Sequence, residues 1–487
     1  MSEGHILVLD EGTTSTRAML YAPDGRRLDM AQAELSQYYP QSGWVEHEAA
    51  EIWERTLACA RRMVEQAGGA DRIAAIGITN QRETVVAWDR HTGEPLARAI
   101  VWQDRRTAGH CAALRDAGEE AAVQRRTGLV LDPYFSATKM RWLLDHAPAV
   151  KEAGDALALG TMESWLVWKL TGGLHISDAS NASRTQLMAL DGEGWDQGLC
   201  DLFGVPLRAL PEIADNAGAF GATLPAWFGR PIPIRGLAGD QQAATIGQGC
   251  LKPGEAKATL GTGAFVLTNR GQAVPASTHR LLGTLLYRLS GQRTYALEGS
   301  IFVAGSLIQW LRDQLGLITT AEETEALARS VADSGGVMML PALAGLGAPH
   351  WRPDATGVIA GLTQGTTRAH IVRAALESLS HQIHDLAGAF AADGVGWHML
   401  RVDGGMSAND WIAQDMANML GLPVDRPADV ETTARGAAML AAVGHGLFPS
   451  LEAAFAAMGS QLTRFSPAMP VEIRAARLSG WNRLLNQ

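Results

Sequence analysis

The chain has 487 residues, of which 47% are hydrophobic and 19% are charged, and its formal net charge is −10. This composition is typical of a folded globular protein, and the length exceeds what one hydrophobic core normally serves, so we expect two domains. The negative net charge and the lack of a basic run argue against nucleic acid as a partner, and no uncharged stretch is long enough to predict a transmembrane segment.

The start of the chain and the cysteine spacing indicate the cellular compartment. No basic segment followed by a long apolar one precedes the first strand-like residues, so we expect no signal peptide and a cytoplasmic protein. The cysteines lie far apart and lack both Cys-x-x-Cys pairs and histidines at zinc spacing. We therefore expect free thiols at Cys59, Cys111, Cys200 and Cys250.

The first half of the chain opens with two predicted strands joined by a polar turn. Apolar residues 6–10 and 17–21 predict the strands, and Glu11-Gly12-Thr13-Thr14-Ser15-Thr16 predicts the turn. Residues 48–66 then place apolar side chains at helical spacing, and the runs 73–79 and 97–102 are typical of buried strands.

The second half repeats the opening pattern. Residues 256–260 and 264–268 predict strands on either side of Gly261-Thr262-Gly263, and this short similarity indicates a duplicated domain. Leu251-Lys252-Pro253-Gly254 comes just before the repeat and is the best candidate boundary. We therefore expect an α/β fold with domains 1–250 and 251–487.

Two later segments support the α/β assignment. Apolar residues at steps of three and four over 372–390 predict an amphipathic helix. A predicted strand at 400–403 leads through two glycines to another helix, with Asn409 as the candidate N-cap and Gly421 as the candidate C-cap. Strands and helices thus alternate in both halves.

The polar turns supply the groups that hold phosphates. No Gly-Lys dipeptide occurs, which excludes a Walker A loop, and no His-Arg-Asp loop of the protein-kinase type is present. The glycine and hydroxyl groups of the first turn instead suit an anion-binding concavity of backbone N–H groups. Gly261-Thr262-Gly263 and Asp403-Gly404-Gly405 offer similar chemistry, and together the three turns favour nucleotide binding over ordinary hairpins. Asp10, at the end of the first strand, is a candidate Mg²⁺ ligand.

Several stretches resemble the FGGY carbohydrate kinases of the actin/hexokinase/Hsp70-like superfamily, over essentially the whole chain. They are residues 10–17, 43–47, 77–84, 102–106, 134–146, 238–242, 261–263 and 357–377. Among them, Asn80-Gln81-Arg82-Glu83-Thr84 is specific for the branch that phosphorylates glycerol. The resemblance implies a two-domain, actin-like fold (a duplicated ribonuclease H-like fold) with a nucleotide cleft between the domains. It also implies ATP-dependent phosphorylation of glycerol to sn-glycerol 3-phosphate.

The resemblance further implies which residues form the substrate site. The glycerol pocket would consist of Arg82, Glu83, Trp102, Tyr134, Asp240, Gln241 and Phe265. Charged side chains would bond the hydroxyl groups while aromatic rings wall the hydrocarbon edge, and Asp240 would be the general base for the attacking hydroxyl. Taken singly, these residues also have structural interpretations: a surface Arg–Glu pair, a core tryptophan and an aspartate that caps a helix.

The nucleotide and metal residues follow from the same resemblance. It implies ATP and Mg²⁺, with Asp10 linked to the metal. The residues around the nucleotide would be Thr13, Thr14, Ser15, Arg17, Thr262, Gly305, Gln309, Gly405 and Asn409. A homodimer and a homotetramer both stay open as the state of assembly.

Some positions depart from the family pattern or invite another interpretation. Glu11 stands where the family commonly has glutamine, and its carboxylate either weakens nucleotide binding or assists Mg²⁺. His350-Trp351 replaces the common Tyr-Trp, with no consequence that can be argued. His381 and His384 lie three residues apart on a predicted helix, but no third metal ligand is evident, so we expect both to face solvent.

Two rival functions are compatible with the pattern. One is a family kinase that acts on another small polyol or a sugar. The other is a catalytically silent nucleotide-binding regulator on the same fold. Retention of Asp10 and Asp240 argues against the silent regulator.

Residues 220–232 bear on regulation. Some members of the family are inhibited by fructose 1,6-bisphosphate through a glycine-rich, basic loop in this region, and others are activated by phosphorylation of a histidine there. Here the loop has Arg230 as its one basic residue, no histidine, and prolines at 225 and 231. Because a bisphosphate needs several clustered cationic donors, we predict insensitivity to both forms of control.

Overall fold

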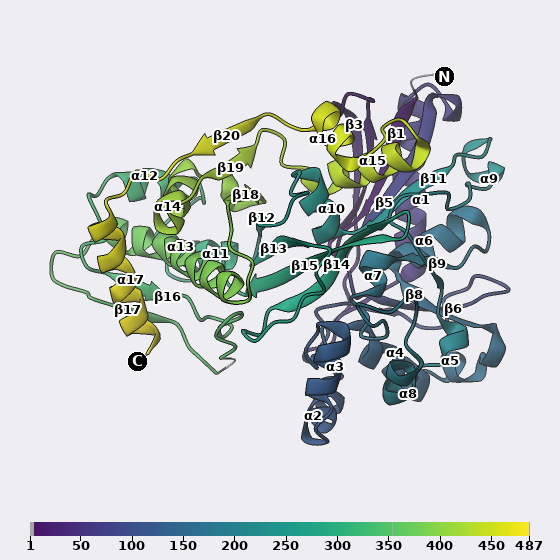
Figure 1. Ribbon diagram of the computed structural model, residues 1–487, viewed down its shortest axis with the longest axis horizontal. Helices are drawn as coiled ribbons and strands as arrows, with labels where there is room; N and C mark the ends of the chain where they lie inside the picture. Colours follow the sequence, from purple (N-terminus) through teal and green to yellow (C-terminus); the bar gives the residue numbers. More distant parts are fainter. Residues whose placement is uncertain (1–3, 353, 487) are drawn as a thin grey trace.

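The computed structural model describes residues 4–352 and 354–486, which fold into two lobes, each built around its own sheet (Figure 1). The sheet of the first lobe has the strand order β11-β5-β1-β2-β3. Its strands are β1 (His5–Glu11), β2 (Ser15–Tyr21), β3 (Arg27–Glu34), β5 (Ile73–Asn80) and β11 (Ile234–Gly239). The opening strand-turn-strand pattern and the buried strand at 73–79 are therefore confirmed.

The second lobe repeats this topology in a larger sheet of order β14-β15-β13-β12-β18-β19-β20. Its strands are β12 (Glu255–Leu260), β13 (Ala264–Gly271), β14 (Leu282–Leu289), β15 (Gln292–Ile301), β18 (Met399–Asp403), β19 (Val424–Pro427) and β20 (Leu462–Phe465). As β1 does with β2 and β5, β12 pairs antiparallel with β13 and parallel with β18. This shared pairing confirms the duplicated strand-turn-strand pattern, with β14 and β20 added at the edges.

Both faces of the first sheet are buried. Successive side chains of β1 point to opposite faces, and each set packs in its own core. Leu7 and Leu9 pack in a core shared with helix α1 (Ala49–Gln66), whose apolar stripe produces the predicted helical spacing. Ile6 and Val8 point to the opposite face. That face is covered by α15 (Thr432–His445), a helix from the second half of the chain, which lies against β1, β5 and β11 (Figure 1).

The two halves are thus interwoven at a helix crossing. Helix α10 (Asp240–Gly247) packs along α15 so closely that a Cβ atom added at Gly436 would overlap the carbonyl oxygen of Ala243. Only glycine permits that backbone approach. Helix α15 belongs to the second half of the chain but packs on the first lobe, so the two lobes do not correspond to two consecutive halves of the sequence. The boundary between residues 250 and 251 therefore stays a prediction.

The remaining elements complete the lobes. A smaller sheet of order β4-β7-β6-β8 contains β4 (Glu46–His47), β6 (Val85–Asp89), β7 (Ala99–Ile100) and β8 (Leu157–Thr161). Two strand pairs are β9 (Ile176–Asp178) with β10 (Glu212–Ala214) and β16 (Met338–Leu340) with β17 (Val358–Ala360). Of the predicted strand at 97–102, only the two residues of β7 form a ladder.

The other helices lie around these sheets. In the first half they are α2 (Ala108–Asp116), α3 (Glu120–Thr127), α4 (Ser136–His146), α5 (Pro148–Glu152), α6 (Met162–Thr171), α7 (Ala179–Ala182), α8 (Gln197–Phe203) and α9 (Pro225–Phe228). In the second half they are α11 (Gly305–Asp313), α12 (Glu323–Arg329), α13 (Arg368–Ala392), α14 (Asp410–Leu420), α16 (Leu451–Met458) and α17 (Val471–Leu485). Within the described ranges, no helix combines the length and apolarity needed to cross a bilayer.

Several local predictions are confirmed and one is wrong. Helix α14 begins after Asn409, whose side chain accepts a hydrogen bond from the Ile412 N–H, and it ends at Gly421 with a φ of 69°. The cysteines are free and buried. His381, in contrast, does not face solvent: it is buried and stacks on Trp481 of α17, because α17 covers that side of α13.

Candidate active site

The candidate catalytic residues converge because three parallel strands end at one edge of the first sheet. Strand β5 runs parallel to both β1 and β11. Asp10 lies near the end of β1, Arg82 and Glu83 follow β5, and Asp240 directly follows β11 as the first residue of α10. In open α/β sheets, ligands bind outside the carboxyl ends of the strands.

A cavity of about 50 Å³, here called the smaller cavity, lies at this edge. Its lining contains all seven residues that the resemblance assigned to the substrate, together with one residue of the first turn: Thr13, Arg82, Glu83, Trp102, Tyr134, Asp240, Gln241 and Phe265. Phe265 comes from β13, so the second lobe contributes a wall. The chemistry of the lining is divided, with charged and amide groups on one part and aromatic rings on another.

The aromatic wall is held together by edge-on ring contacts and one hydrogen bond. The Trp102 ring lies 5.7 Å from that of Tyr134 and 6.4 Å from that of Phe265, measured between centroids. The Trp102 indole N–H donates to the Thr13 hydroxyl oxygen over 2.9 Å. That bond connects the smaller cavity directly to the first turn.

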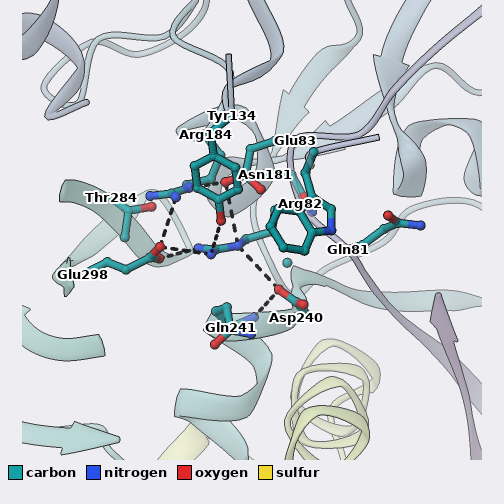
Figure 2. A network of polar contacts seen from close by, with 12 residues as sticks. Gln81, Arg82, Glu83, Tyr134, Asn181, Arg184, Asp240, Gln241, Thr284 and Glu298 are labelled. Atoms are coloured by element: carbon teal, nitrogen blue, oxygen red, sulfur yellow. Dashed lines mark hydrogen bonds and ion pairs between the residues drawn. The ribbon is translucent and has the colours of Figure 1, made fainter. Parts of the chain in front are cut away.

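The charged part of the smaller cavity is anchored by a buried ionic network (Figure 2). Arg82 donates from both terminal nitrogens to the Glu298 carboxylate, at 2.6 and 3.1 Å. Arg184 donates to Glu298 at 3.1 Å and to Glu83 at 2.6 Å. Burial raises the pKa of Glu298, but the Arg184 and Arg82 guanidinium groups outweigh this and lower it to about 2. Two arginines and two glutamates therefore balance one another, as buried charges must.

This network orients the two residues that the sequence singled out. Besides binding Glu298, Arg82 donates to the Tyr134 hydroxyl over 3.2 Å and lies 3.4 Å from an Asp240 oxygen through its Nε. Glu83 has a φ of 61°, which is costly for a residue with a side chain. Its side chain is held by Arg184, and its carbonyl accepts from Ser136. The Arg82–Glu83 pair is thus buried rather than a surface ion pair.

Asp240 is the carboxylate best placed to react. About one third of its side chain is exposed, and its Oδ1 accepts a hydrogen bond from the Gln241 N–H over 2.6 Å. Desolvation raises the pKa of Asp240, while the positive charges of Arg82 and Lys257 oppose the rise. A carboxylate in this setting can accept a proton from a hydroxyl group in the smaller cavity.

A cavity of about 380 Å³, here called the larger cavity, lies in the second lobe. It is lined by the five second-half residues that the resemblance assigned to the nucleotide, namely Thr262, Gly305, Gln309, Gly405 and Asn409. It is also lined by Gly261 of the second turn and by residues that the sequence analysis missed: Leu260, Ile308, Arg312, Ala321, Glu322, Thr324, Glu325, Met406, Ala408 and Ile412. Its size suits a nucleotide-sized ligand.

Two glycines allow the turns to meet beside the larger cavity. Gly305, the first residue of α11, donates its N–H to the Gly261 carbonyl over 2.8 Å, and a Cβ at Gly305 would lie 2.6 Å from that oxygen. Gly404 has a φ of 83° and packs on the backbone of Leu260. The N-terminus of α11 is consequently aimed at the second turn, where its partial positive charge favours an anion.

The first turn has a different composition. Asp10 binds Arg17, whose other terminal nitrogen binds Glu431 over 2.8 Å just before α15. Burial raises the pKa of Asp10 to about 6, against the lowering effect of Arg17 and with the support of Glu431 and Asp240. Thr14, Ser15 and Arg17 lie on this turn and the strand after it, outside both cavities. The structure therefore places four of the nine proposed nucleotide residues apart from the other five.

The donor set near Asp10 fits a magnesium ion held mainly by substrate phosphates. The Glu431 and Asp240 carboxylates contribute to the raised pKa of Asp10, and a divalent cation would offset that negative charge. Among residues 4–352 and 354–486, however, no cluster of three or more metal-ligating side chains forms a protein cage. One or two carboxylates with phosphates and water is the usual arrangement for Mg²⁺.

The position of the Glu11 side chain bears on the effect of this residue, which replaces the family's common glutamine. It is fully buried and accepts a hydrogen bond over 3.0 Å from Thr56 of α1, so it points into the lobe and not toward the first turn. Burial raises the pKa of Glu11 to about 8. At neutral pH the group is therefore mostly a neutral acid, which makes it closer to glutamine in charge than its formula suggests.

Sequence reasoning missed three charged residues that support the site: Arg184, Glu298 and Lys257. Glu298 and Lys257 are buried charges inside strands β15 and β12, each with alanine, leucine or glycine as its neighbours along the strand. A lone charge in a buried strand requires a partner, and that signal could have identified both. Arg184 follows the short helix α7 and carries no comparable local signal.

Comparisons with known proteins agree with this architecture. Residues 5–247 match the N-terminal domain and residues 256–445 the C-terminal domain of the FGGY family of carbohydrate kinases. The chain is 53% identical to a protein named glycerol kinase from Methylobacterium nodulans, over 98% of this chain and 97% of the relative. The structure of Plasmodium falciparum glycerol kinase with ADP superposes with a TM-score of 0.94 at 35% identity, covering 99% of this chain and 98% of the other. A xylulose kinase from Rhodospirillum rubrum superposes with a TM-score of 0.88 at 25% identity, covering 99% of each chain. The chain therefore belongs to the FGGY family of carbohydrate kinases.

Proposed function

We propose that the protein transfers the γ-phosphoryl group of ATP to glycerol and forms sn-glycerol 3-phosphate. The observation that carries this proposal is the smaller cavity, where hydrogen-bonding groups and an aromatic wall meet beside Asp240. Its volume of about 50 Å³ provides only a few water-sized positions, since one water needs about 10–15 Å³. That size suits a three-carbon triol better than a pentose or hexose derivative.

The residues of the smaller cavity take separate parts in binding. Arg82 and Glu83 present donors and acceptors to the hydroxyl groups, and Gln241 adds an amide. Trp102 and Phe265 pack against the hydrocarbon edge, which lacks hydrogen-bonding groups. Because the buried ionic network fixes Arg82 and Glu83 in advance, little ordering accompanies glycerol binding.

The transfer itself is a displacement at phosphorus. The terminal hydroxyl oxygen of glycerol forms a bond to the γ-phosphorus while the bond from that phosphorus to the β,γ-bridging oxygen breaks. The hydroxyl proton passes to the Asp240 carboxylate and then to solvent, and ADP leaves with the bridging oxygen. Asp240 is the first residue of α10 and lies beside Arg82 with about one third of its side chain exposed, so a substrate hydroxyl can reach it.

The nucleotide and metal sites complete the proposal. The larger cavity would hold the nucleoside part of ATP, with the glycine turns at Gly261 and Gly404 approaching the phosphates. Asp10 would hold Mg²⁺ directly or through water, and Arg17 would orient that carboxylate. When bound, Mg²⁺ neutralises charge on the phosphate oxygens.

The leading alternative is a related kinase for another polyol or a sugar. The 53% identity to a glycerol kinase, against 25% to a xylulose kinase, favours glycerol, as does the small volume of the cavity. A catalytically silent regulator on the same fold is disfavoured by the assembled Asp10, Arg82 and Asp240.

A substrate screen tests the proposal. ADP release from MgATP is measured with glycerol, dihydroxyacetone, erythritol, xylulose and gluconate, with Asp240→Asn as the matched inactive control. Glycerol should give the highest kcat/KM. A higher value for a five- or six-carbon substrate would replace glycerol, and single-turnover transfer to none of them would support the regulator.

Location and assembly are separate parts of the proposal. We expect the protein to act in the cytoplasm, as inferred from the sequence, and as a homodimer or homotetramer. Light scattering at several protein concentrations distinguishes these two assemblies from a monomer.

A further inference from the structure

A buried lysine of the second lobe lies against the substrate residues of the first. Lys257 has no exposed surface and lies on β12, with its ammonium donating to the Gln241 side-chain oxygen over 2.5 Å. A second donation, over 2.9 Å, goes to the hydroxyl of Thr259, two residues along the same face of β12. Neither the family resemblance nor the hydrogen-bonding needs of a strand account for a lysine at this position.

The contact with Lys257 determines which way the Gln241 amide faces. An ammonium group has three donors and no acceptor, so only the amide oxygen can face it. Gln241 is half-buried and also lines the smaller cavity. With its oxygen held by Lys257, its NH₂ group is free to donate to a substrate oxygen, next to Asp240, which accepts.

Charged groups from several elements surround Lys257 and Asp240. Asp403 of β18, Asp240 of α10 and Glu298 of β15 favour the charged ammonium, whereas Arg82 and burial oppose it. Burial raises the pKa of Asp240, whereas Arg82, whose Nε lies 3.4 Å from an Asp240 oxygen, and Lys257 lower it.

We infer that Lys257 is a positioning residue of the phosphoryl-transfer site, which holds the Gln241 side chain as a hydrogen-bond donor to the substrate. This inference rests on the proposed phosphorylation of glycerol. It makes Gln241, a substrate residue of the first lobe, depend on a side chain of the second lobe. The two lobes must therefore be correctly placed for substrate binding.

Two substitutions of Lys257 test this role. Lys257→Met removes both the donor and the charge, and Lys257→Arg keeps the charge in a different geometry. In Lys257→Met, the KM for glycerol should rise about tenfold or more, because Gln241 loses its partner. The KM for MgATP should change far less, because Lys257 does not line the larger cavity. Lys257→Arg, which keeps a cationic donor, should raise the KM for glycerol less than Lys257→Met does.

Matched controls make the test independent of folding and of the proposed function. Thr259→Val removes the other acceptor of Lys257 and should change the KM for glycerol by less than about threefold. Gln241→Glu keeps the contact with Lys257 but removes the donor, so glycerol binding measured by calorimetry should weaken about tenfold or more. An unchanged KM for glycerol in Lys257→Met, or unchanged glycerol binding in Gln241→Glu, would overturn the inference. Failure of the wild-type protein to phosphorylate glycerol would instead overturn the proposed function.

Discussion

The two strand-turn-strand units share one topology and differ in their chemistry. In both, a glycine N–H closes the turn, from Gly12 to the Ser15 carbonyl over 3.0 Å and from Gly261 to the Gly263 carbonyl over 2.9 Å. The first unit carries Asp10, Glu11 and Arg17, whereas residues 259–265 of the second unit include no charged side chain.

The difference indicates that the two duplicated units have separate roles in the site. The first unit lies beside Asp240 and the smaller cavity, where charge changes during the reaction. The turn of the second unit lies beside the larger cavity, where its backbone approaches α11 and the turn at Gly404. We therefore expect the first turn to be sensitive to charge and the second turn to be sensitive to size.

The largest expected effect is the loss of charge at Asp240. Asp240→Asn preserves shape but cannot accept the proton, so turnover should fall about 10²–10⁴-fold. MgATP affinity should stay nearly unchanged, because the larger cavity does not include this residue. Initial rates and nucleotide binding by calorimetry check both. A rate within a few-fold of wild type would remove Asp240 from the role of base.

Next in size are the substitutions Arg82→Ala and Glu83→Ala. Each should raise the KM for glycerol about 10–100-fold, and that for ATP far less, since the lost hydrogen bonds belong to the smaller cavity. Arg82→Ala also leaves Glu298 short of a partner, so it should lower thermal stability as well. Steady-state kinetics with each substrate varied is the measurement. Equal changes in both KM values would indicate a purely structural ion pair.

Added size should matter most in the second unit. In Gly305→Ala the new Cβ would lie 2.6 Å from the Gly261 carbonyl oxygen. Overpacking of this kind should weaken nucleotide binding about tenfold and leave the KM for glycerol unchanged. Gly388→Ala in α13 is the matched control, because its Cβ would meet open space. Similar effects from both alanines would contradict the proposed division between charge and size.

A smaller effect, on stability, is expected at Glu11. Burial raises its pKa to about 8 from an ordinary 4.5, so the folded protein binds a proton that the unfolded chain releases in this range. Stability from this group is full below about pH 4.5 and falls as pH rises to about 8. Glu11→Gln should flatten that decline, with a Tm gain at about pH 8.5 that disappears near about pH 4.5. Equal Tm changes at both pH values would show that ionisation of Glu11 is not the cause.

No effect is expected from fructose 1,6-bisphosphate. Arg230, the one basic residue of 220–232, is paired with Asp71, and the segment contains the short helix α9. A bisphosphate therefore finds no cluster of free cations in this loop. Activity titrated against the compound at several enzyme concentrations checks this. Saturable inhibition at millimolar or lower levels would indicate a site on another surface.

The sequence predicted elements best where local pattern and packing agree. The turn after β1, helix α13 and the caps of α14 follow from periodicity, glycine and Asn409. The strand at 97–102 was overpredicted, because its apolar run packs largely outside a ladder. His381 was misplaced because the sequence of α13 does not reveal that α17 covers it.

The candidate site was predictable as a set of residues but not as a network. The resemblance named Arg82, Glu83 and Asp240, and the chain brings them together at one edge of the first sheet. Their partners Arg184 and Glu298 come from distant segments. Contacts between residues 101 and 216 positions apart produce no periodic pattern in the sequence. Long-range ionic contacts of this kind depend on the tertiary fold.

The covering of the first sheet by α15 has a consequence for how the chain is made. Strands β1, β2, β5 and β11 are synthesised early, but the helix that buries their second face emerges about 200 residues later. At a ribosomal rate of about 5–20 residues per second, this delay is roughly 10–40 s. During that interval Ile6 and Val8 lack their cover, so a nascent chain or a fragment ending near residue 250 presents an apolar sheet face to the chaperones that bind such surfaces.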